Sequence, residues 1–237
     1  GIPIDVSIEG RINYDVDGSF KNTHCIVRDV TEKKKAEENL VYISYHDYLT
    51  GLFNRRYFEE ELVRLDSEEN LPLSILMGDI NGLKLINDTL GHSFGDNLIT
   101  ETSKILRKCM KEKYLLSRTG GDEFTVIMPN TDYSEARDLI KSLNEEIREH
   151  NNSRDDVINV NLSLGAATKE RSDQSISEII RDAEYNMYQR KLLEKKSSHS
   201  SIISSMQATM IEKSHETEAH ARRLAAMARA IGEKMSL

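Results

Sequence analysis

Two adjacent glycines, Gly120 and Gly121, separate two short runs of strand-forming residues, Tyr114–Arg118 and Glu123–Met128. Glycine adopts backbone angles that other residues avoid, and it lets a ligand approach the main chain closely. The arrangement therefore predicts a β-hairpin with the glycines at its turn. Two acids follow directly, and carboxylates at such a turn suit a divalent cation. Taken alone, a Gly-Gly-Asp sequence is usually only a turn, so the rest of the chain has to decide between these interpretations.

Strands and helices alternate around this turn, from residue 47 to residue 196. Apolar runs predict strands at Leu73–Asp79 and Val157–Leu164, the second of which leaves the sheet through small residues at 165–167. Capping patterns begin at Asp132 and at Ser175. The predicted helices cover residues 55–66, 93–113, 132–149 and 175 to past 188. This order predicts an α+β fold with a central, mostly antiparallel sheet and surrounding helices.

The two ends of the chain have different patterns. Residues 1–30 predict strands with a turn at Asp15–Gly18, and because a lone hairpin is marginally stable we expect it to belong to a larger sheet. Residues 31–46 predict an amphipathic linker helix, with a parallel coiled coil between two subunits as the alternative. A serine-rich boundary at 197–201 precedes further helix. The chain begins without methionine in what the pattern indicates is the middle of a domain, so we expect a fragment of a longer protein.

Composition argues against several functions. The net charge of -8 argues against broad nucleic-acid binding, so a nucleotide would need local lysines and a metal. The two cysteines, Cys25 and Cys109, have no ligand-like spacing and fit a reducing compartment. The sequence has no apolar run long enough to span a bilayer and no signal peptide. We therefore expect a cytoplasmic location with no membrane insertion of this part of the chain.

A polar stretch follows the predicted strand that ends at Asp79. An acid at this position either caps the next helix or holds a metal at the rim of the sheet. The stretch contains amides, carboxylates, a lysine and glycines, including Asn81, Lys84, Asn87 and Asp96. A packed core would not need this mixture. Any one of these residues fits a structural role, but together they indicate a site.

Three separated segments, residues 47–56, 79–96 and 120–124, resemble in order and spacing the signatures of the GGDEF family of diguanylate cyclases. The resemblance covers about residues 40–196. It implies a fold similar to the palm of nucleotide polymerases and nucleotidyl cyclases. It also implies the condensation of two GTP molecules into cyclic di-GMP with release of two pyrophosphates, with Mg²⁺ or Mn²⁺ as cofactor. The active form implied is a homodimer with one GTP per subunit, because two sites must face each other.

The resemblance assigns a metal and catalytic set. Asp79 and the backbone carbonyl of Ile80 match the first metal-binding position, and Asp122 matches the second. Asp122 is also the implied base for the attacking 3′-hydroxyl. Glu123 is a further implied acid of the metal site. The implied catalytic residues are therefore Asp79, Asp122 and Glu123.

The resemblance also assigns a substrate-binding set. The implied phosphate-binding lysines are Lys84, Lys191 and Lys195. Asn87 and Asp96 match the pair that reads guanine, and a carboxylate there accepts two hydrogen bonds that adenine does not offer. Gly120 and Gly121 would let the backbone pass under the phosphates.

Some positions depart from the family pattern. Lys111 and Tyr114 stand where the family often has the Arg and Asp of a product-binding inhibitory site, so we predict that tight feedback inhibition through that site is absent. Leu83 and Asn81 replace a usual phenylalanine and a usual aspartate, and both changes leave the implied metal ligands alone. Glu194 replaces a common glycine, which weakens the assignment of the lysine that follows it.

The flanks resemble other domains. Residues 1–30 look like the last strands of a PAS domain, followed by a signalling linker at 31–46, and residues 197–237 look like the start of an HD-GYP phosphodiesterase. Glu216 and His220 match that family's first metal-binding pair, but a solvated helix is the better interpretation here, and we expect no phosphodiesterase activity. An alternative function is a catalytically silent module that senses GTP or cyclic di-GMP for a downstream phosphodiesterase. A third is a dimerising relay.

Overall fold

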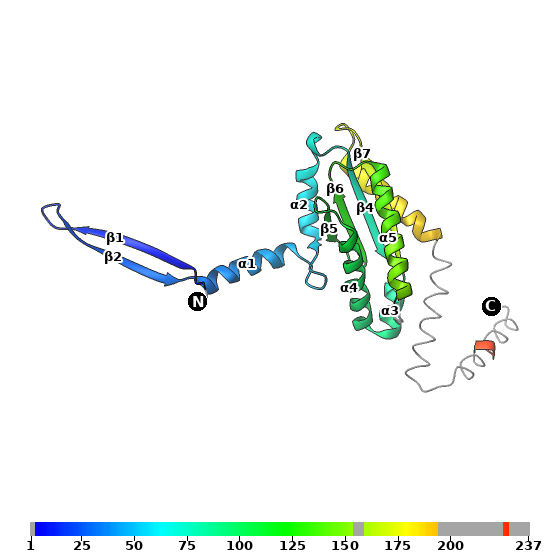
Figure 1. Cartoon of the computed structure of the whole chain (residues 1–237), viewed down its shortest axis with the longest axis horizontal. Coiled ribbons are helices and arrows are strands. Elements are labelled where there is room, and N and C mark those ends of the chain that lie inside the picture. The colour runs from blue at the N-terminus through cyan, green and yellow to red at the C-terminus, as the bar shows by residue number, and fades with distance from the viewer. Residues whose placement is uncertain (1–2, 154–158, 194–224, 228–237) are drawn as a thin grey trace.

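The structure, a computed structural model, describes residues 3–153, 159–193 and 225–227. Within these ranges, none of the helices combines the length and the apolar character that crossing a membrane requires. Figure 1 shows that the chain has two regions of different shape, because a long hairpin and one helix project from an αβ body.

The projecting region is β1 (Val6–Tyr14), β2 (Phe20–Asp29) and α1 (Thr31–Tyr45). The two strands pair antiparallel, and the predicted turn lies between them, where Gly18 has a φ of 81°. On α1, the apolar residues Leu40 and Ile43 are each 68% exposed. Like most of the hairpin, this helix therefore leaves its apolar side chains largely uncovered.

The body contains a five-stranded sheet in the order β3-β5-β6-β4-β7. Its strands are β3 (Phe53–Asn54), β4 (Leu73–Ile80), β5 (Leu115–Arg118), β6 (Glu123–Met128) and β7 (Leu162–Lys169). The pair β3–β5 is parallel and the other pairs are antiparallel. The predicted α+β fold with a mostly antiparallel sheet is confirmed, as is the hairpin of β5 and β6.

Helices cover both faces of this sheet (Figure 1). Side chains alternate between faces along β4, so Leu76 and Ile80 join the larger core while Leu73 and Ile75 join a smaller one. The helical elements of the body are α2 (Arg55–Leu65), the 3₁₀ turn η1 (Glu68–Asn70), α3 (Leu83–Leu90), α4 (His92–Cys109), α5 (Tyr133–Ser153) and the helical segment 176–193. Buried residues of α3, α4 and α5 line the larger core, and buried residues of α2 and of segment 176–193 line the smaller one.

Strand β7 corrects the predicted position of the last strand. It begins at Leu162 rather than at residue 157, and it includes the small residues 165–167 instead of ending before them. Gly165 explains this, because a Cβ atom there would lie 2.1 Å from the backbone nitrogen of Met187 and 2.6 Å from the carbonyl oxygen of Ala183. The small residues therefore do not mark an exit. They allow the helical segment 176–193 to pack directly on the strand.

Two helical features were predicted differently. Helix α3 was not predicted, and the long helix predicted at 93–113 is α4, which ends at Cys109. The cap at Asp132 is confirmed, because its Oδ1 atom accepts a 2.9 Å hydrogen bond from the Glu135 backbone N–H. These boundaries fix where the polar residues between β4 and α4 lie.

Candidate active site

An acid lies at the end of β4, on the sheet face covered by residues 176–193. Asp79 is 6% exposed, and its Oδ1 atom accepts a 2.6 Å hydrogen bond from Lys191 Nζ. Lys191 follows Met187 by about one helical turn, and the Met187 backbone packs against Gly165 of β7. The close approach of helix and strand thus brings together two predicted site residues that are 112 positions apart in the sequence.

The glycine turn lies beside Asp79. In the register of β4 and β6, Asp79 is opposite Glu123, and the Ile80 N–H donates a 3.0 Å hydrogen bond to the Asp122 carbonyl. The Thr119 N–H donates to the Glu123 carbonyl at 3.0 Å, which closes the turn. The acids of the second and third sequence segments therefore meet at one edge of the sheet.

Neither Gly120 nor Gly121 has a positive φ, so this turn does not use the left-handed angles that glycine permits. The turn spans four residues, and loops of this length reverse the chain without a left-handed residue. The Glu123 side chain lies close to Gly120, because a Cβ there would lie 2.6 Å from Glu123 Oε2 and would displace that carboxylate. A Cβ on Gly121 would have no heavy atom within 4 Å, so open space adjoins the main chain at that point.

An ion pair fixes the base of this turn. Arg118 Nη1 donates to both carboxylate oxygens of Asp47 at 3.0 Å, and Arg118 Nη2 donates to the Gly121 carbonyl at 2.8 Å. Asp47 Oδ1 also accepts hydrogen bonds from the backbone N–H and hydroxyl of Thr50, at 2.9 and 2.7 Å. Burial by itself raises the pKa of Asp47, but the hydrogen bonds from Thr50 and Arg118 outweigh this and leave that pKa below its usual value.

Two acids at the sheet edge, Asp79 and Glu123, have a pKa shift in the opposite direction. Burial raises the pKa of Asp79, the hydrogen bond from Lys191 opposes this, and the charge of Asp122 adds to the increase. Partial desolvation also raises the pKa of Glu123, together with the charges of Asp122, Asp79 and Glu184. Negative charge therefore accumulates here beyond what Lys191 neutralises, which is typical of a site that takes a cation.

The donor chemistry of this edge fits a hard divalent cation. Among the described residues, no three acidic, histidine or cysteine side chains are close enough to hold a metal by themselves. Magnesium does not require such a cage, because it is usually bound through one or two carboxylates plus substrate phosphates. Asp79 and Asp122, beside the end of β4 at Ile80, offer that smaller set.

The predicted guanine-reading pair lies where α3 approaches the start of α4. A Cβ on Gly95 would lie 2.0 Å from Asn87 Oδ1, so the Asn87 amide rests against Gly95, one residue before Asp96. Asn87 Oδ1 is buried and has no hydrogen-bond partner within the described part of the chain. Asp96 is exposed. An unsatisfied buried acceptor is costly, and a ligand that donates to it would remove that cost.

The structure does not bring the remaining predicted site residues into contact with the acids at the sheet edge, or it does not describe them. Lys84 is exposed in the first turn of α3, and within the described part of the chain no hydrogen bond or ion pair joins it to these acids. Lys195, like Glu194, Glu216 and His220, lies outside the described residues.

The sequence analysis missed a polar network beside Asp79. Asn81 is 7% exposed, and its Nδ2 donates to Asn161 Oδ1 at 2.8 Å and to Ser163 Oγ at 2.9 Å. Ser163 is opposite Asp79 in the register of β4 and β7. These hydrogen bonds join the end of β4 to β7 and hold the strand end that carries the acid. The signal in the sequence that could have indicated this network is an asparagine two residues after the acid that ends a predicted strand.

An α+β fold with acids at one edge of a mostly antiparallel sheet is what the resemblance to a nucleotidyl cyclase type of domain implies. Residues 44–197 match the family described as diguanylate cyclase, GGDEF domain. This segment is well over half of the chain, and the chain belongs to that family.

Individual relatives agree with this family. Over 171 residues the chain is 32% identical to diguanylate cyclase DgcM of Escherichia coli (strain K12), covering 70% of this chain and 41% of DgcM. Over 178 residues it is 29% identical to cyclic di-GMP phosphodiesterase PdeR of the same strain, covering 73% of this chain and 27% of PdeR. The chain therefore spans less than half the length of either relative.

Solved structures agree in fold. The crystal structure of the coiled coil and GGDEF domain of DgcB from Caulobacter crescentus, in complex with c-di-GMP, is similar with a TM-score of 0.60. The match covers 71% of this chain and 89% of that one, at 24% identity.

Proposed function

We propose that this chain is a diguanylate cyclase that condenses two GTP molecules into cyclic di-GMP and two pyrophosphates. Family membership and the relative DgcM support a nucleotidyl cyclase. The observation that carries the proposal is the convergence of Asp79, Asp122, Glu123 and Lys191 at one sheet edge, with the pKa of both Asp79 and Glu123 raised.

The acidic residues would hold Mg²⁺ or Mn²⁺. In this proposal the ligands are the carboxylates of Asp79 and Asp122 and the carbonyl of Ile80, with Glu123 as a further acid. A bound cation would neutralise charge on the phosphates and lower the pKa of the attacking hydroxyl. Lys191 donates to Asp79, and its ammonium group would bind the triphosphate as a point charge.

The chain's other residues would bind and orient GTP. Asn87 and Asp96 would read guanine. The buried Oδ1 of Asn87, which has no hydrogen-bond partner among the described residues, supports this because guanine supplies N–H donors. The open space at Gly121 supports passage of the phosphates close to the main chain, as proposed also for Gly120. Lys84 and Lys195 would add positive charge near the phosphates.

Asp122 would accept the proton of the 3′-hydroxyl. The 3′-oxygen of one GTP then bonds to the α-phosphorus of the other, and the bond from that phosphorus to the bridging oxygen breaks to release pyrophosphate. Two such steps close the ring. They need two facing sites, so we propose a two-fold homodimer with one GTP per subunit. The exposed apolar residues of α1, including Leu40 and Ile43, support a coiled coil as one route to this dimer. Because GTP is the substrate, we place the activity in the cytoplasm.

The product-binding inhibitory site would be absent. Lys111 Nζ lies 3.4 Å from Glu135 and 5.5 Å from the centre of the Tyr114 ring. Tyr114 itself is 8% exposed and cannot supply the carboxylate of the family's site. Saturable binding of cyclic di-GMP that is abolished by Lys111→Ala would overturn this part of the proposal.

A second candidate function is a catalytically silent module that senses GTP or cyclic di-GMP. The relative PdeR, a cyclic di-GMP phosphodiesterase, favours it. The third, a dimerising relay, predicts signalling that is unaffected by Asp122→Ala. The flanks belong to the same proposal, with β1 and β2 as the end of a PAS-like domain, α1 as a signalling linker and residues 197–237 as the start of an HD-GYP-like domain.

The deciding experiment incubates the purified chain with GTP and Mg²⁺, beside Asp122→Ala, and resolves the nucleotides by chromatography. Cyclic di-GMP from the parent and none from the variant supports the cyclase. Metal-dependent GTP binding without product, both in the chain itself and after fusion to a dimeric coiled coil, supports the silent module instead. If product appears only after fusion, the result supports a cyclase whose active dimer does not form from this length of chain alone.

A further inference from the structure

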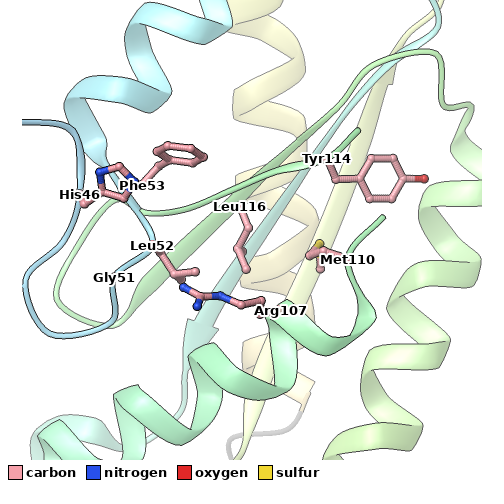
Figure 2. A pocket seen from close by; sticks show the side chains of 8 residues that line it. All are labelled: His46, Gly51, Leu52, Phe53, Arg107, Met110, Tyr114 and Leu116. Carbon is pink, nitrogen blue, oxygen red and sulfur yellow. The ribbon is translucent and has the colours of Figure 1, made fainter. Parts of the chain in front are cut away.

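A cavity lies at the junction of the projecting region and the body. Its walls come from the residue after α1, the turn before β3, the end of α4 and strand β5 (Figure 2). None of the residues proposed to bind GTP or metal lines it. It is therefore distinct from the sheet edge that carries Asp79.

The size of the cavity favours a single-ring ligand. Its volume is about 190 Å³. Pockets that bind drug-sized ligands have volumes of roughly 300–1,000 Å³, whereas an engineered cavity of about 150 Å³ in another protein binds benzene. One aromatic ring with a small substituent would fill the space.

The walls are flat and apolar. Leu52 and Leu116 are 4% and 7% exposed. The rings of His46 and Phe53 lie with their centres 4.8 Å apart, and His46 also stacks on Tyr42 at 3.9 Å. Figure 2 shows His46 and Phe53 on one side of the cavity and the Leu116 side chain pointing into it. Aromatic and branched apolar surfaces of this kind pack well against a planar ring.

The rim carries a positive charge that can bind a ligand. Arg107 reaches from α4 toward Gly51 and Leu52 (Figure 2), and its Nη2 makes a long 3.4 Å hydrogen bond to the Thr50 carbonyl. Within the described ranges no carboxylate forms an ion pair with Arg107, although its guanidinium has five N–H donors. Two parallel donors of an arginine match the two oxygens of a carboxylate.

We propose that this cavity binds a small aromatic carboxylate, with its ring between Phe53, Leu52 and Leu116 and its carboxylate on Arg107. The ligand would contact His46, which ends the linker helix, and β5, which continues into Arg118 and the glycine turn. It would thus sit between the projecting region and the proposed catalytic loop. This site goes beyond the proposed function and does not depend on it.

The test titrates the 237-residue chain with benzoate and follows the backbone amide signals by NMR. A ligand of this size is expected to bind with a dissociation constant on the order of 1 mM. The signals of Gly51, Leu52 and Leu116 should shift and saturate. Arg107→Gln should weaken benzoate at least about tenfold, while neutral benzamide should bind the parent and the variant alike.

Two controls make the test selective. Lys108→Gln, one residue along α4, removes a lysine that pairs with Glu146 at 2.6 Å and should leave benzoate binding unchanged. Met110→Phe fills the cavity and should abolish binding of both probes. The proposal is overturned if benzoate gives no saturable shifts at these residues, if acetate binds equally well, or if Arg107→Gln binds benzoate like the parent.

Discussion

Two carboxylates with basic partners behave in opposite ways in this molecule. Asp47 accepts two hydrogen bonds from Arg118 and two from Thr50, and its pKa is lowered. Asp79 accepts one hydrogen bond from Lys191, lies near Asp122, and its pKa is raised. Both side chains are largely buried, so burial alone does not separate them.

The difference lies in how completely each charge is satisfied. The ionised form of Asp47 stabilises the fold, because its environment favours the charge. Burial and the charge of Asp122 disfavour the ionised form of Asp79, and an acid with a pKa raised in this way is typical of a functional site. We therefore expect changes at Asp47 to affect stability and changes at Asp79 to affect activity.

The largest expected effect is on catalysis. Asp79→Asn should lower the rate of cyclic di-GMP formation on the order of 10³-fold, since it removes a carboxylate proposed to hold the cation. The melting temperature should change less than in Asp47→Asn, because a neutral amide does not suffer the repulsion from Asp122. Rates and melting curves measured on the same preparation check both statements. Activity near that of the parent in a folded Asp79→Asn variant would contradict the proposed role.

The next effect is on folding stability. Asp47→Asn should cost about 2–4 kcal/mol of unfolding free energy, because it leaves the Arg118 guanidinium without a counter-charge in a largely buried position. The matched control is Asp138→Asn, whose pair with Lys141 is exposed, so that the loss of unfolding free energy should be far smaller than in Asp47→Asn. Urea unfolding measures both. Equal losses of unfolding free energy in the two variants would contradict the proposed difference between the buried and the exposed ion pair.

Two glycines extend the comparison to the backbone. Gly165→Ala should cost about 1–3 kcal/mol, because the new Cβ meets the backbone of Met187 and Ala183. Gly121→Ala should change stability by less than about 0.5 kcal/mol but weaken GTP binding, because its Cβ enters only the open space. Unfolding curves and GTP titrations of both variants test this. A Gly121→Ala variant with unchanged GTP affinity would argue against phosphates passing at this point.

The smallest effect is on the pH dependence of stability without metal. The pKa of Asp47 is lowered on folding, so its contribution is present above the ordinary value of about 4 and is lost as the pH falls through the lowered pKa. The pKa of Asp79 is raised, so ionisation destabilises the fold at neutral pH and stability returns as the pH falls through the raised pKa. As the pH falls, the stability that Asp47→Asn has lost relative to the parent should therefore decrease. Over the same fall in pH, the stability of Asp79→Asn relative to the parent should decline. Unfolding midpoints measured from neutral pH down to well below the ordinary carboxylate pKa of about 4 check this.

The sequence predicted those parts of the fold that local pattern determines. Continuous apolar runs gave β4 and the hairpin of β5 and β6 nearly residue for residue, and the Asp132 cap marked the start of α5. Helix α3 was missed because it is short and its polar residues suggested a loop with binding groups. The end of β7 was misplaced because small residues promote both chain exits and close packing, and only the helix on top of Gly165 distinguishes the two.

The sequence predicted which residues belong to the candidate site, but much less of how these residues contact one another. The resemblance named Asp79, Asp122 and Lys191, but the contact between Asp79 and Lys191 depends on a helix that packs on β7. The unpartnered Oδ1 of Asn87 and the network of Asn81 also arise only when distant segments meet. The roles of these residues stay predictions until GTP and metal are tested.

Arg118 bonds to both Asp47 and the Gly121 carbonyl, and this restricts which substitutions the sequence can accept during evolution. Replacing either residue of the pair alone leaves the other as an unpaired buried charge, so we expect positions 47 and 118 to change together. Among descendants of this chain, a substitution at one position should survive only in company with a compensating substitution at the other.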